Sequence, residues 1–283
     1  MSVAAAVRGG RALRASMWLG WQVSTNWTQP ALFAVYALLK PLSGALILAV
    51  MYRVVAGERA QGYLAFLVIG TAFWSLVQAG LGGFANSVSE DRSMYRTLKY
   101  VYMAPQHPYV YLVGRAAGTL VSAVVSVAVV LLVATPALHL PIDVLHVDWP
   151  LLLAACLGGV VATLSLGVTV AVLLLGARDS HGHGEIIAQT LYIVSGAIFP
   201  IAILPGPLAA LAAWLPFASW LELVRRALLG AQAPRMFPEL GDGAVLLRLL
   251  LTTALTVVVG HLLFTWGDRR ARRLGLVDRA SSW

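Results

Sequence analysis

The sequence predicts an all-α integral membrane protein, with six transmembrane helices in a single domain over residues 1–283. Of its residues 59% are hydrophobic and only 11% are charged, whereas a soluble domain carries about 25% charged residues. Several apolar segments exceed the roughly 20 residues that a helix needs to cross a bilayer. We find no internal repeat and no low-complexity tract, so we expect one domain.

The first predicted element is a helix at residues 8–24 that lies in the membrane interface. At helical spacing Arg11 and Arg14 share one side, and Met17 and Trp21 share another. Tryptophan is enriched where the bilayer meets water. This pattern indicates contact with lipid headgroups and not a crossing helix.

Six apolar segments follow, and we interpret each as a transmembrane helix. We expect the spans at residues 30–55, 63–88, 109–135, 151–176, 186–204 and 244–266. In the fourth span Gly158, Gly159 and Gly167 should let neighbouring helices approach closely. Lys40 lies within the first span, where a charge is costly. Either it faces protein or water and serves a function, or its side chain reaches out to the membrane surface.

The distribution of basic residues predicts the orientation of the chain. Thirteen Lys and Arg residues lie on the side of the two termini, and six lie on the opposite side. Because cytoplasmic loops carry the excess of positive charge, both termini should be cytoplasmic, in a multi-pass protein of the cell membrane. The same scatter over the span ends accounts for the net charge of +8, so we do not expect a nucleic-acid partner.

The stretch at residues 87–105, between the second and third spans, is unusually charged. Ser87 and Glu90 fit a capping box that would start a short helix, and Pro105 would stop it. One face of this helix would carry three basic residues, Arg92, Arg96 and Lys99. Two interpretations are open: the helix contacts a soluble partner, or it is a basic loop on anionic lipid.

The stretch at residues 205–230, between the fifth and sixth spans, predicts a re-entrant pair of short helices. Pro205 and Pro207 break the fifth span, and the apolar run after them is too short to cross before Pro216 divides it. Glu222 and Arg226 stand at helical spacing, where they could pair. Such irregular backbone needs protein around it, because lipid offers no hydrogen bonds.

Motifs that carry chemistry are missing from the sequence. It contains no Gly-x-x-x-x-Gly-Lys-Ser/Thr phosphate loop and no Gly-x-Ser-x-Gly nucleophile motif, so we do not expect an enzyme. The best metal candidate is the trio His181, His183 and Glu185. Its spacing matches zinc sites poorly, so a solvated loop is the preferred interpretation. The single cysteine, Cys156, excludes an internal disulfide.

Two stretches carry a resemblance to a known family. The first contains Glu90-Asp91-Arg92, Thr97-Leu98, Pro105 and Gly114-Arg115; the second contains Ser195-Gly196, Phe199-Pro200, Leu204-Pro205, Pro216, Glu222 and Arg225. In this order they resemble the coupling helix and a second signature of ABC transporter type-2 permeases, which are the membrane subunits of drug, lipid and polysaccharide exporters. Arg96 and Lys99 depart from the pattern, since the family often has Gly and Glu there.

The resemblance implies a permease subunit of an ATP-driven exporter. Separate cytosolic ABC ATPase subunits would bind ATP and Mg²⁺, with no cofactor in this chain, and a second permease copy or a paralogue would complete the transporter. The implied substrate is a small amphipathic drug-like molecule or a lipid. The alternatives are a secondary transporter, which would need carboxylates inside its spans and usually inverted repeats, and a non-catalytic structural subunit of the membrane.

The expected site residues fall into two groups. Coupling to the ATPase is expected of Glu90, Asp91, Arg92, Tyr95, Arg96, Lys99, Tyr102, Pro105, Arg178, Asp179, His181 and Glu185. The substrate path or its gate is expected to include Lys40, Phe73, Trp74, Ser195, Phe199, Pro200, Pro205, Pro216, Glu222 and Arg225.

Overall fold

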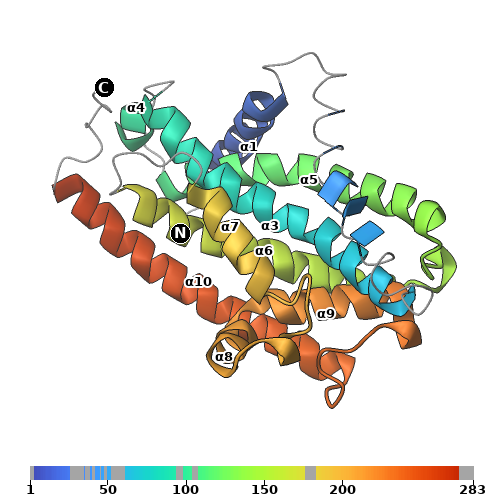
Figure 1. Ribbon diagram of the computed structural model, residues 1–283. Coiled ribbons are helices and arrows are strands. Elements are labelled where there is room, and N and C mark those ends of the chain that lie inside the picture. Colours follow the sequence, from blue (N-terminus) through green and yellow to red (C-terminus); the bar gives the residue numbers. More distant parts are fainter. Residues whose placement is uncertain are drawn as a thin grey trace.

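The computed structural model describes residues 3–25, 61–93, 98–103, 108–175 and 183–273, together with separate positions between 35 and 51. All regular secondary structure in this part of the chain is helical, as predicted. Figure 1 shows the long helices side by side in one bundle, with shorter helices packed beside them.

Helix α3 (Gln61–Ser93) is the centre of the bundle (Figure 1). It packs against α5 (Pro108–Leu138), α6 (Trp149–Leu175), α7 (His183–Val194) and α9 (Pro216–Leu229). The helix is apolar around most of its circumference, and such a helix is stable only where it is covered on all sides. Accordingly, every residue from position 64 to position 70 is buried.

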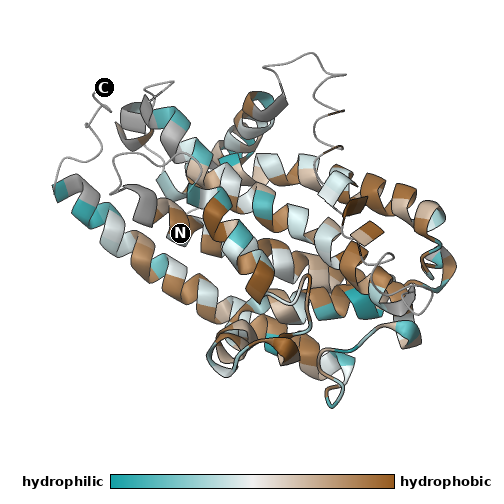
Figure 2. Ribbon diagram, viewed as in Figure 1, coloured by the Kyte–Doolittle hydropathy of each residue, from teal (hydrophilic) through white to brown (hydrophobic). Residues whose placement is uncertain are grey.

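Helix α10 (Asp242–Arg273) packs against α6 and α9 on one side only. On its other side Leu250, Leu251 and Leu262 are each more than half exposed. Figure 2 shows hydrophobic residues along the middle of α10 and hydrophilic ones at its C-terminal end. An apolar surface of this extent indicates a lipid-facing helix with one end in water.

Four of the described helices are long and apolar enough to cross a membrane: Tyr63–Ser87, Pro108–Leu138, Trp149–Val172 and Asp242–Arg270. They correspond to the predicted second, third, fourth and sixth spans. A bent pair of helices, Gly206–Trp214 with Pro216–Gln232, would be a fifth if it is one broken span. The predicted first span, 30–55, lies mostly outside the described residues, as does Lys40.

The prediction for the fifth span, 186–204, is wrong in its length. Helix α7 has 12 residues, or about 18 Å of helix, whereas the hydrocarbon core is about 30 Å thick. The chain turns after Val194, where Gly196 has a φ of 80°, a conformation that glycine adopts without a steric penalty. Pro200 then precedes the short 3₁₀ helix η3 (Ile201–Ile203).

The helix start predicted at Ser87 is also wrong. Helix α3 continues through this position to Ser93, and the Ser87 hydroxyl donates to the carbonyl oxygen of Gly83, one turn earlier. A serine inside a helix satisfies its hydroxyl in this way, so the spacing of Ser87 and Glu90 does not mark an N-cap. The separate short helix is α4 (Leu98–Met103).

Helix α1 (Val3–Thr25) contains the predicted interfacial helix and crosses α5 at glycine positions. A Cβ added at Gly20 would overlap the backbone of Arg115, and one added at Gly118 would overlap the carbonyl oxygen of Met17. These glycines therefore let the two helix backbones touch. In the same way Gly158, Gly159 and Gly167 of α6 admit Leu249, Trp220 and Phe84, which confirms the close packing predicted for the fourth span.

Candidate functional site

Two short helices occupy the stretch at residues 205–230, as predicted. Helix α8 (Gly206–Trp214) and α9 meet at Leu215 and Pro216 with a bend of 74°. Pro216 is the first residue of α9, a position where its missing N–H is not needed, whereas it would break a continuous helix. Every residue of α9 is buried, so its three charged residues lie inside the protein.

The predicted pairing of Glu222 with Arg226 is present and belongs to a larger network. The Arg226 Nη2 lies 2.8 Å from Glu222 Oε1, and both side chains are buried. Arg226 also pairs with Asp242 Oδ1 at 2.8 Å and donates to the carbonyl oxygens of Phe237 and Leu240. The second Glu222 oxygen accepts the Met236 N–H. One arginine thus ties α9 to the loop that leads into α10.

Arg225 is fully buried and binds the broken end of α7. Its Nη2 donates to the carbonyl oxygens of Gly196 and Ala197, at 3.0 and 3.1 Å. Its Nε donates to the Phe66 carbonyl oxygen of α3, and the guanidinium lies 3.4 Å from the centre of the Phe66 ring. The carbonyls left without helix partners after Val194 therefore receive a side-chain donor.

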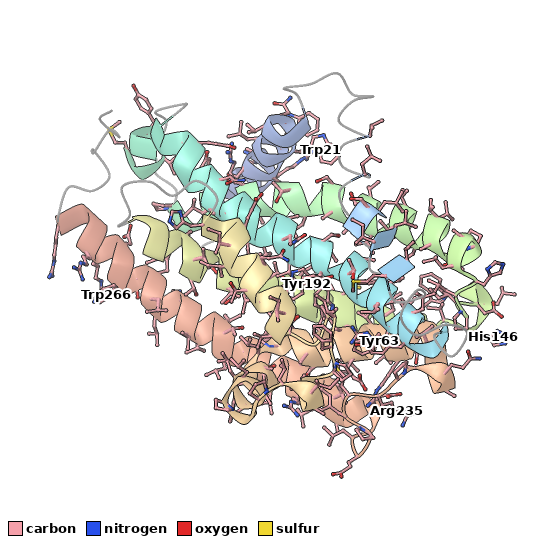
Figure 3. All side chains as sticks on the ribbon, in the orientation of Figure 1. Trp21, Tyr63, His146, Tyr192, Arg235 and Trp266 are labelled. Atoms are coloured by element: carbon pink, nitrogen blue, oxygen red, sulfur yellow. The ribbon has the colours of Figure 1, made fainter. Side chains whose placement is uncertain are left out.

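Polar side chains join α3 to α7 and to the turn that follows α7. The Tyr63 hydroxyl donates to the Ile198 carbonyl oxygen at 2.7 Å, and the hydroxyls of Thr71 and Tyr192 lie 2.8 Å apart. Gln78 donates to Gln189 at 3.2 Å, in an exposed position. Figure 3 shows Tyr192 midway along the bundle and Tyr63 nearer to the end that carries His146. These bonds hold the short α7 against the central helix.

The aromatic residues predicted to line a path are part of the core instead. The Trp74 ring stacks on Tyr192 and meets Phe217 edge to face, and Phe73 meets Trp220 in the same manner. Phe73 and Trp74 are 5% and 1% exposed. Large aromatic rings bury much area and pack well edge to face, so within this chain these two residues line no open space.

The other predicted gate residues lie around the break after α7. Ser195 is buried, and its hydroxyl donates to the Tyr192 carbonyl oxygen. Phe199 is 44% exposed, and Pro200 precedes η3. Pro205 stands directly before α8 and is exposed. With Pro216 they shape the turns between α7, α8 and α9.

A buried ion cluster joins the C-terminal end of α3 to α5. The Arg115 Nη2 lies 3.0 Å from Glu90 Oε2 and 3.7 Å from Asp91 Oδ1. The Tyr111 hydroxyl donates to Asp91 Oδ2 at 2.8 Å, and Arg115 Nε donates to the Ser87 hydroxyl. We call these residues the Arg115 cluster. Because α1 rests on the Arg115 backbone at Gly20, three helices meet here.

The position of Asp91 in the Arg115 cluster differs from the coupling contact expected of it. Asp91 is 1% exposed, so its carboxylate binds within the chain and does not reach a partner from this position. Glu90 has a side chain that is 29% exposed but it too pairs with Arg115. The acidic residues of this stretch thus brace α3 against α5.

The remaining coupling residues are only partly described. Arg92 lies in the last turn of α3 and Glu185 is exposed in the first turn of α7. Helix α4 contains Lys99 and Tyr102, whose side chains lie outside the described part, and exposes Tyr100 and Met103 by 58% and 69%. Outside the described residues lie Tyr95, Arg96, Pro105, Arg178, Asp179 and His181.

The chain was compared with known families. The model of the ABC-2 type transporter family matches residues 12–229, which run from within α1 to the end of α9 and hold both predicted signatures. The chain belongs to the ABC-2 type transporter family. It is a permease subunit of an ABC transporter, and the resemblance seen in the sequence is confirmed. No curated protein matches the chain.

In this ABC-2 permease, the loop between α5 and α6 is stabilised within itself. The Asp143 carboxylate accepts from His146, 2.7 Å away, and from the Leu145 N–H, and these two bonds lower the pKa of Asp143. Asp148 accepts the Leu151 N–H at the start of α6. Among the described residues no group of three metal-binding side chains is found, and His183 and Glu185 are exposed.

Several residues of the ABC-2 permease that carry these contacts were not singled out from the sequence. Tyr63, Thr71, Gln78 and Gln189 join α3 to α7 or to the turn after it, and each is a polar residue in a mainly apolar helix. Their polarity could have identified them in the sequence, since a polar side chain inside a span is rarely without a partner. Arg115 appeared only as part of the Gly-Arg motif, but at helix spacing it stands one turn from Tyr111.

Proposed function

We propose that this permease moves a small amphipathic drug-like molecule or lipid out of the cytoplasm. It works as one half of an exporter, together with a second copy or a related permease and two cytosolic ATPase subunits. Both termini are cytoplasmic in this proposal. Removing the buried Arg115, Arg225 and Arg226 from the sequence count leaves four basic residues on the opposite side against twelve, which strengthens the orientation.

The observation that carries the proposal is the exposed amide pair of Gln78 and Gln189. The two amides bond to each other across α3 and α7 on a surface that also exposes Ile186 and Ile193, by 65% and 49%. Amides that face hydrocarbon lose hydrogen bonds that water or protein would give. A mixed polar and apolar surface of this kind suits a path between two permeases, through which an amphipathic molecule passes.

We propose that coupling to ATP hydrolysis acts at the C-terminal end of α3, the helix that carries Gln78. Helix α4 follows the end of α3 and contacts both α3 and α5, and its exposed Tyr100 and Met103 offer apolar side chains to a partner. The Arg115 cluster fixes α3, α5 and α1 together just behind it. A displacement of α4 by a closing ATPase would therefore move α3, which holds Gln78.

Gln189→Leu should reduce ATP-driven transport severalfold while protein abundance stays normal. Leucine keeps the volume but removes the amide that a polar part of the substrate would meet. The matched control is Thr190→Val, the next residue, whose exposed hydroxyl already bonds to the Ile186 carbonyl oxygen of its own helix. The measurement is the accumulation of ethidium and of a fluorescent phospholipid analogue in inside-out membrane vesicles after addition of ATP.

Each outcome of this transport assay bears on a separate part of the proposal. Accumulation that needs ATP supports export, and accumulation driven by an ion gradient without ATP would instead support a secondary transporter. Normal transport by Gln189→Leu would show that the amide pair does not line the path. Equal losses in Gln189→Leu and Thr190→Val would point to a general disturbance of α7.

A further inference from the structure

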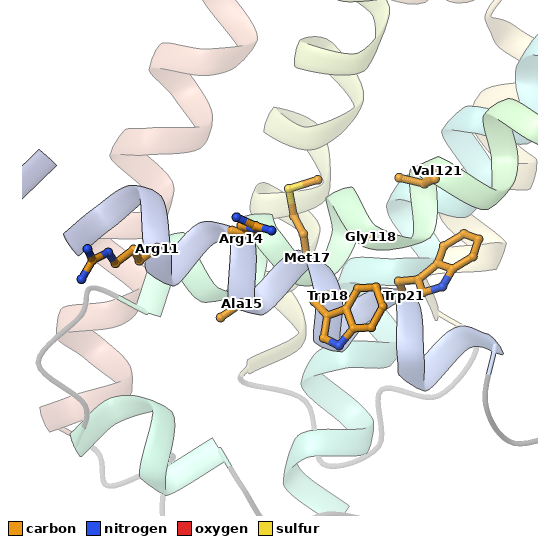
Figure 4. Close-up of a pocket in the computed structure, with 8 residues that line it drawn as sticks. All are labelled: Arg11, Arg14, Ala15, Met17, Trp18, Trp21, Gly118 and Val121. Atoms are coloured by element: carbon orange, nitrogen blue, oxygen red, sulfur yellow. The ribbon is translucent and has the colours of Figure 1, made fainter. Parts of the chain in front are cut away.

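A cavity lies between α1 and α5, away from the surface of the Gln78–Gln189 pair. It has a volume of 780 Å³ and is lined by residues of these two helices, Arg11, Arg14, Ala15, Met17, Trp18, Trp21, Gly118 and Val121. Figure 4 shows α1 running across the direction of the long helices, with Arg11 and Arg14 towards one end of the cavity and Trp21 and Val121 towards the other. The cavity thus has a basic end and an apolar end.

The basic end presents two arginines that have no counter-charge among the described residues. Arg11 and Arg14 are exposed, and neither forms an ion pair with a carboxylate of the described chain. They are one helical turn apart, so both guanidinium groups can reach one anion. Trp18, which is 62% exposed, adds the kind of side chain that lies among lipid headgroups.

The apolar end continues along α5. Val121 is 45% exposed, and Val124, Val125 and Leu132 are exposed by 53%, 54% and 75%. Their spacing places them on neighbouring rows of one helix face. An acyl chain of a lipid could therefore leave the cavity at Val121 and lie along this face, while its headgroup stays beside the arginines.

We propose that the cavity binds one anionic phospholipid, with its phosphate between Arg11 and Arg14 and an acyl chain on the exposed face of α5. Two basic residues beside an apolar groove at a membrane interface form the pattern that recognises acidic headgroups. The bound lipid holds α1 against α5 at Gly118, next to the backbone of Arg115. This site differs from the proposed substrate path, so it binds lipid whether or not lipid is transported.

A second cavity provides the comparison. It has a volume of 510 Å³ near the C-terminal end of α10 and is lined by Thr265, Trp266, Arg269, Arg270 and Arg273. There the Arg270 guanidinium already lies over the Trp266 ring, 5.3 Å from its centre. All of the residues that line this cavity belong to α10, so no second helix adds an exposed apolar groove to it. Arg269 and Arg270 are therefore a control pair of the same charge.

The test is a lipid titration of the purified full-length chain followed by native mass spectrometry. Phosphatidylglycerol and phosphatidylcholine with the same acyl chains are the probes. We expect one phosphatidylglycerol to bind about tenfold more tightly than phosphatidylcholine. The Arg11→Gln, Arg14→Gln variant should lose this preference, and Arg11→Lys, Arg14→Lys should keep most of it. The Arg269→Gln, Arg270→Gln control should behave as the wild type.

Four results would overturn the proposal. The first is equal binding of the two lipids by the wild type, and the second is an unchanged preference in the Arg11→Gln, Arg14→Gln variant. The third is full displacement of phosphatidylglycerol by millimolar glycerol 3-phosphate, which would show that the arginines bind a free anion without the lipid. Val121→Trp keeps both charges but fills the apolar end, so it should weaken phosphatidylglycerol binding. Unchanged binding by that variant would also contradict the assigned acyl-chain position.

Discussion

Replacing Arg226 with methionine should destabilise the protein by about 3–5 kcal/mol, the usual cost of removing one partner from a buried ion pair. Glu222 is fully buried and, among the described residues, would keep only the Met236 N–H as a donor. The carbonyl oxygens of Phe237 and Leu240 would also lose the Arg226 N–H groups. We expect the loop before α10 to detach from α9 as a result.

Unfolding in mixed detergent micelles would measure this loss. Glu222→Gln should cost less than Arg226→Met, because Arg226 retains Asp242 and both carbonyl oxygens. The double variant Glu222→Gln, Arg226→Met should be more stable than Arg226→Met alone, since the Glu222 carboxylate is then no longer a buried charge that has lost its partner. The control is Arg235→Met, at an exposed arginine of the neighbouring loop. If the loss of unfolding free energy in the double variant equals the sum of the losses in the two single variants, the pairing of Glu222 with Arg226 is contradicted.

Arg115→Leu should have a comparable effect at the other end of α3, with a loss of about 3–5 kcal/mol. It would leave the buried Asp91 carboxylate with the Tyr111 hydroxyl and without the positive charge of Arg115. Since the Arg115 cluster joins α3 to α5, we also expect ATP hydrolysis by the assembled transporter to stop responding to transported substrate.

Arg115→Lys and Asp91→Asn separate the two effects. Lysine keeps the charge but cannot reproduce the guanidinium's contacts with Glu90 and Ser87 at once, so stability should fall less than in Arg115→Leu. Asp91→Asn combined with Arg115→Leu removes both charges and should recover part of the stability without restoring coupling. The readouts are the free energy of unfolding and the substrate-stimulated rate of ATP hydrolysis. Normal stimulation in Arg115→Leu would mean that the cluster is structural only.

The sequence predicted best those features that depend on neighbours in the chain. The long apolar runs identified α3, α5, α6 and α10, because length and hydropathy decide whether a helix can cross. Pro216 divided α8 from α9, and Glu222 met Arg226 one turn away. In each case the interacting groups are close in sequence, so spacing alone was informative.

Contacts between distant residues account for the failures. The break after α7 depends on Arg225, which reaches back to Gly196 and Ala197, while the apolar sequence there suggested a longer span. Ser87 fitted an N-cap, but it lies inside a continuous helix and its hydroxyl accepts from Arg115 of α5. Phe73 and Trp74 suggested a path, and only the packing of α7 and α9 over them revealed a core. No local pattern distinguishes these alternatives.

The most direct test of the proposed transporter is the recovery of a phosphate-loop ATPase with the tagged full-length chain from its own membranes. Tyr100→Gln with Met103→Gln removes the exposed apolar side chains of α4 without changing charge or helix propensity much. Leu145→Gln is the matched control, because Leu145 is 90% exposed in the loop between α5 and α6.

We predict that the wild type and Leu145→Gln bring down the ATPase in equal amounts. The α4 double variant should recover about tenfold less, because two large apolar side chains no longer pack in the contact. If the double variant retains its ATPase in full and hydrolyses ATP with normal stimulation by substrate, α4 is not the coupling element. If the wild type brings down no such ATPase, the assignment as half of an ATP-driven exporter is contradicted.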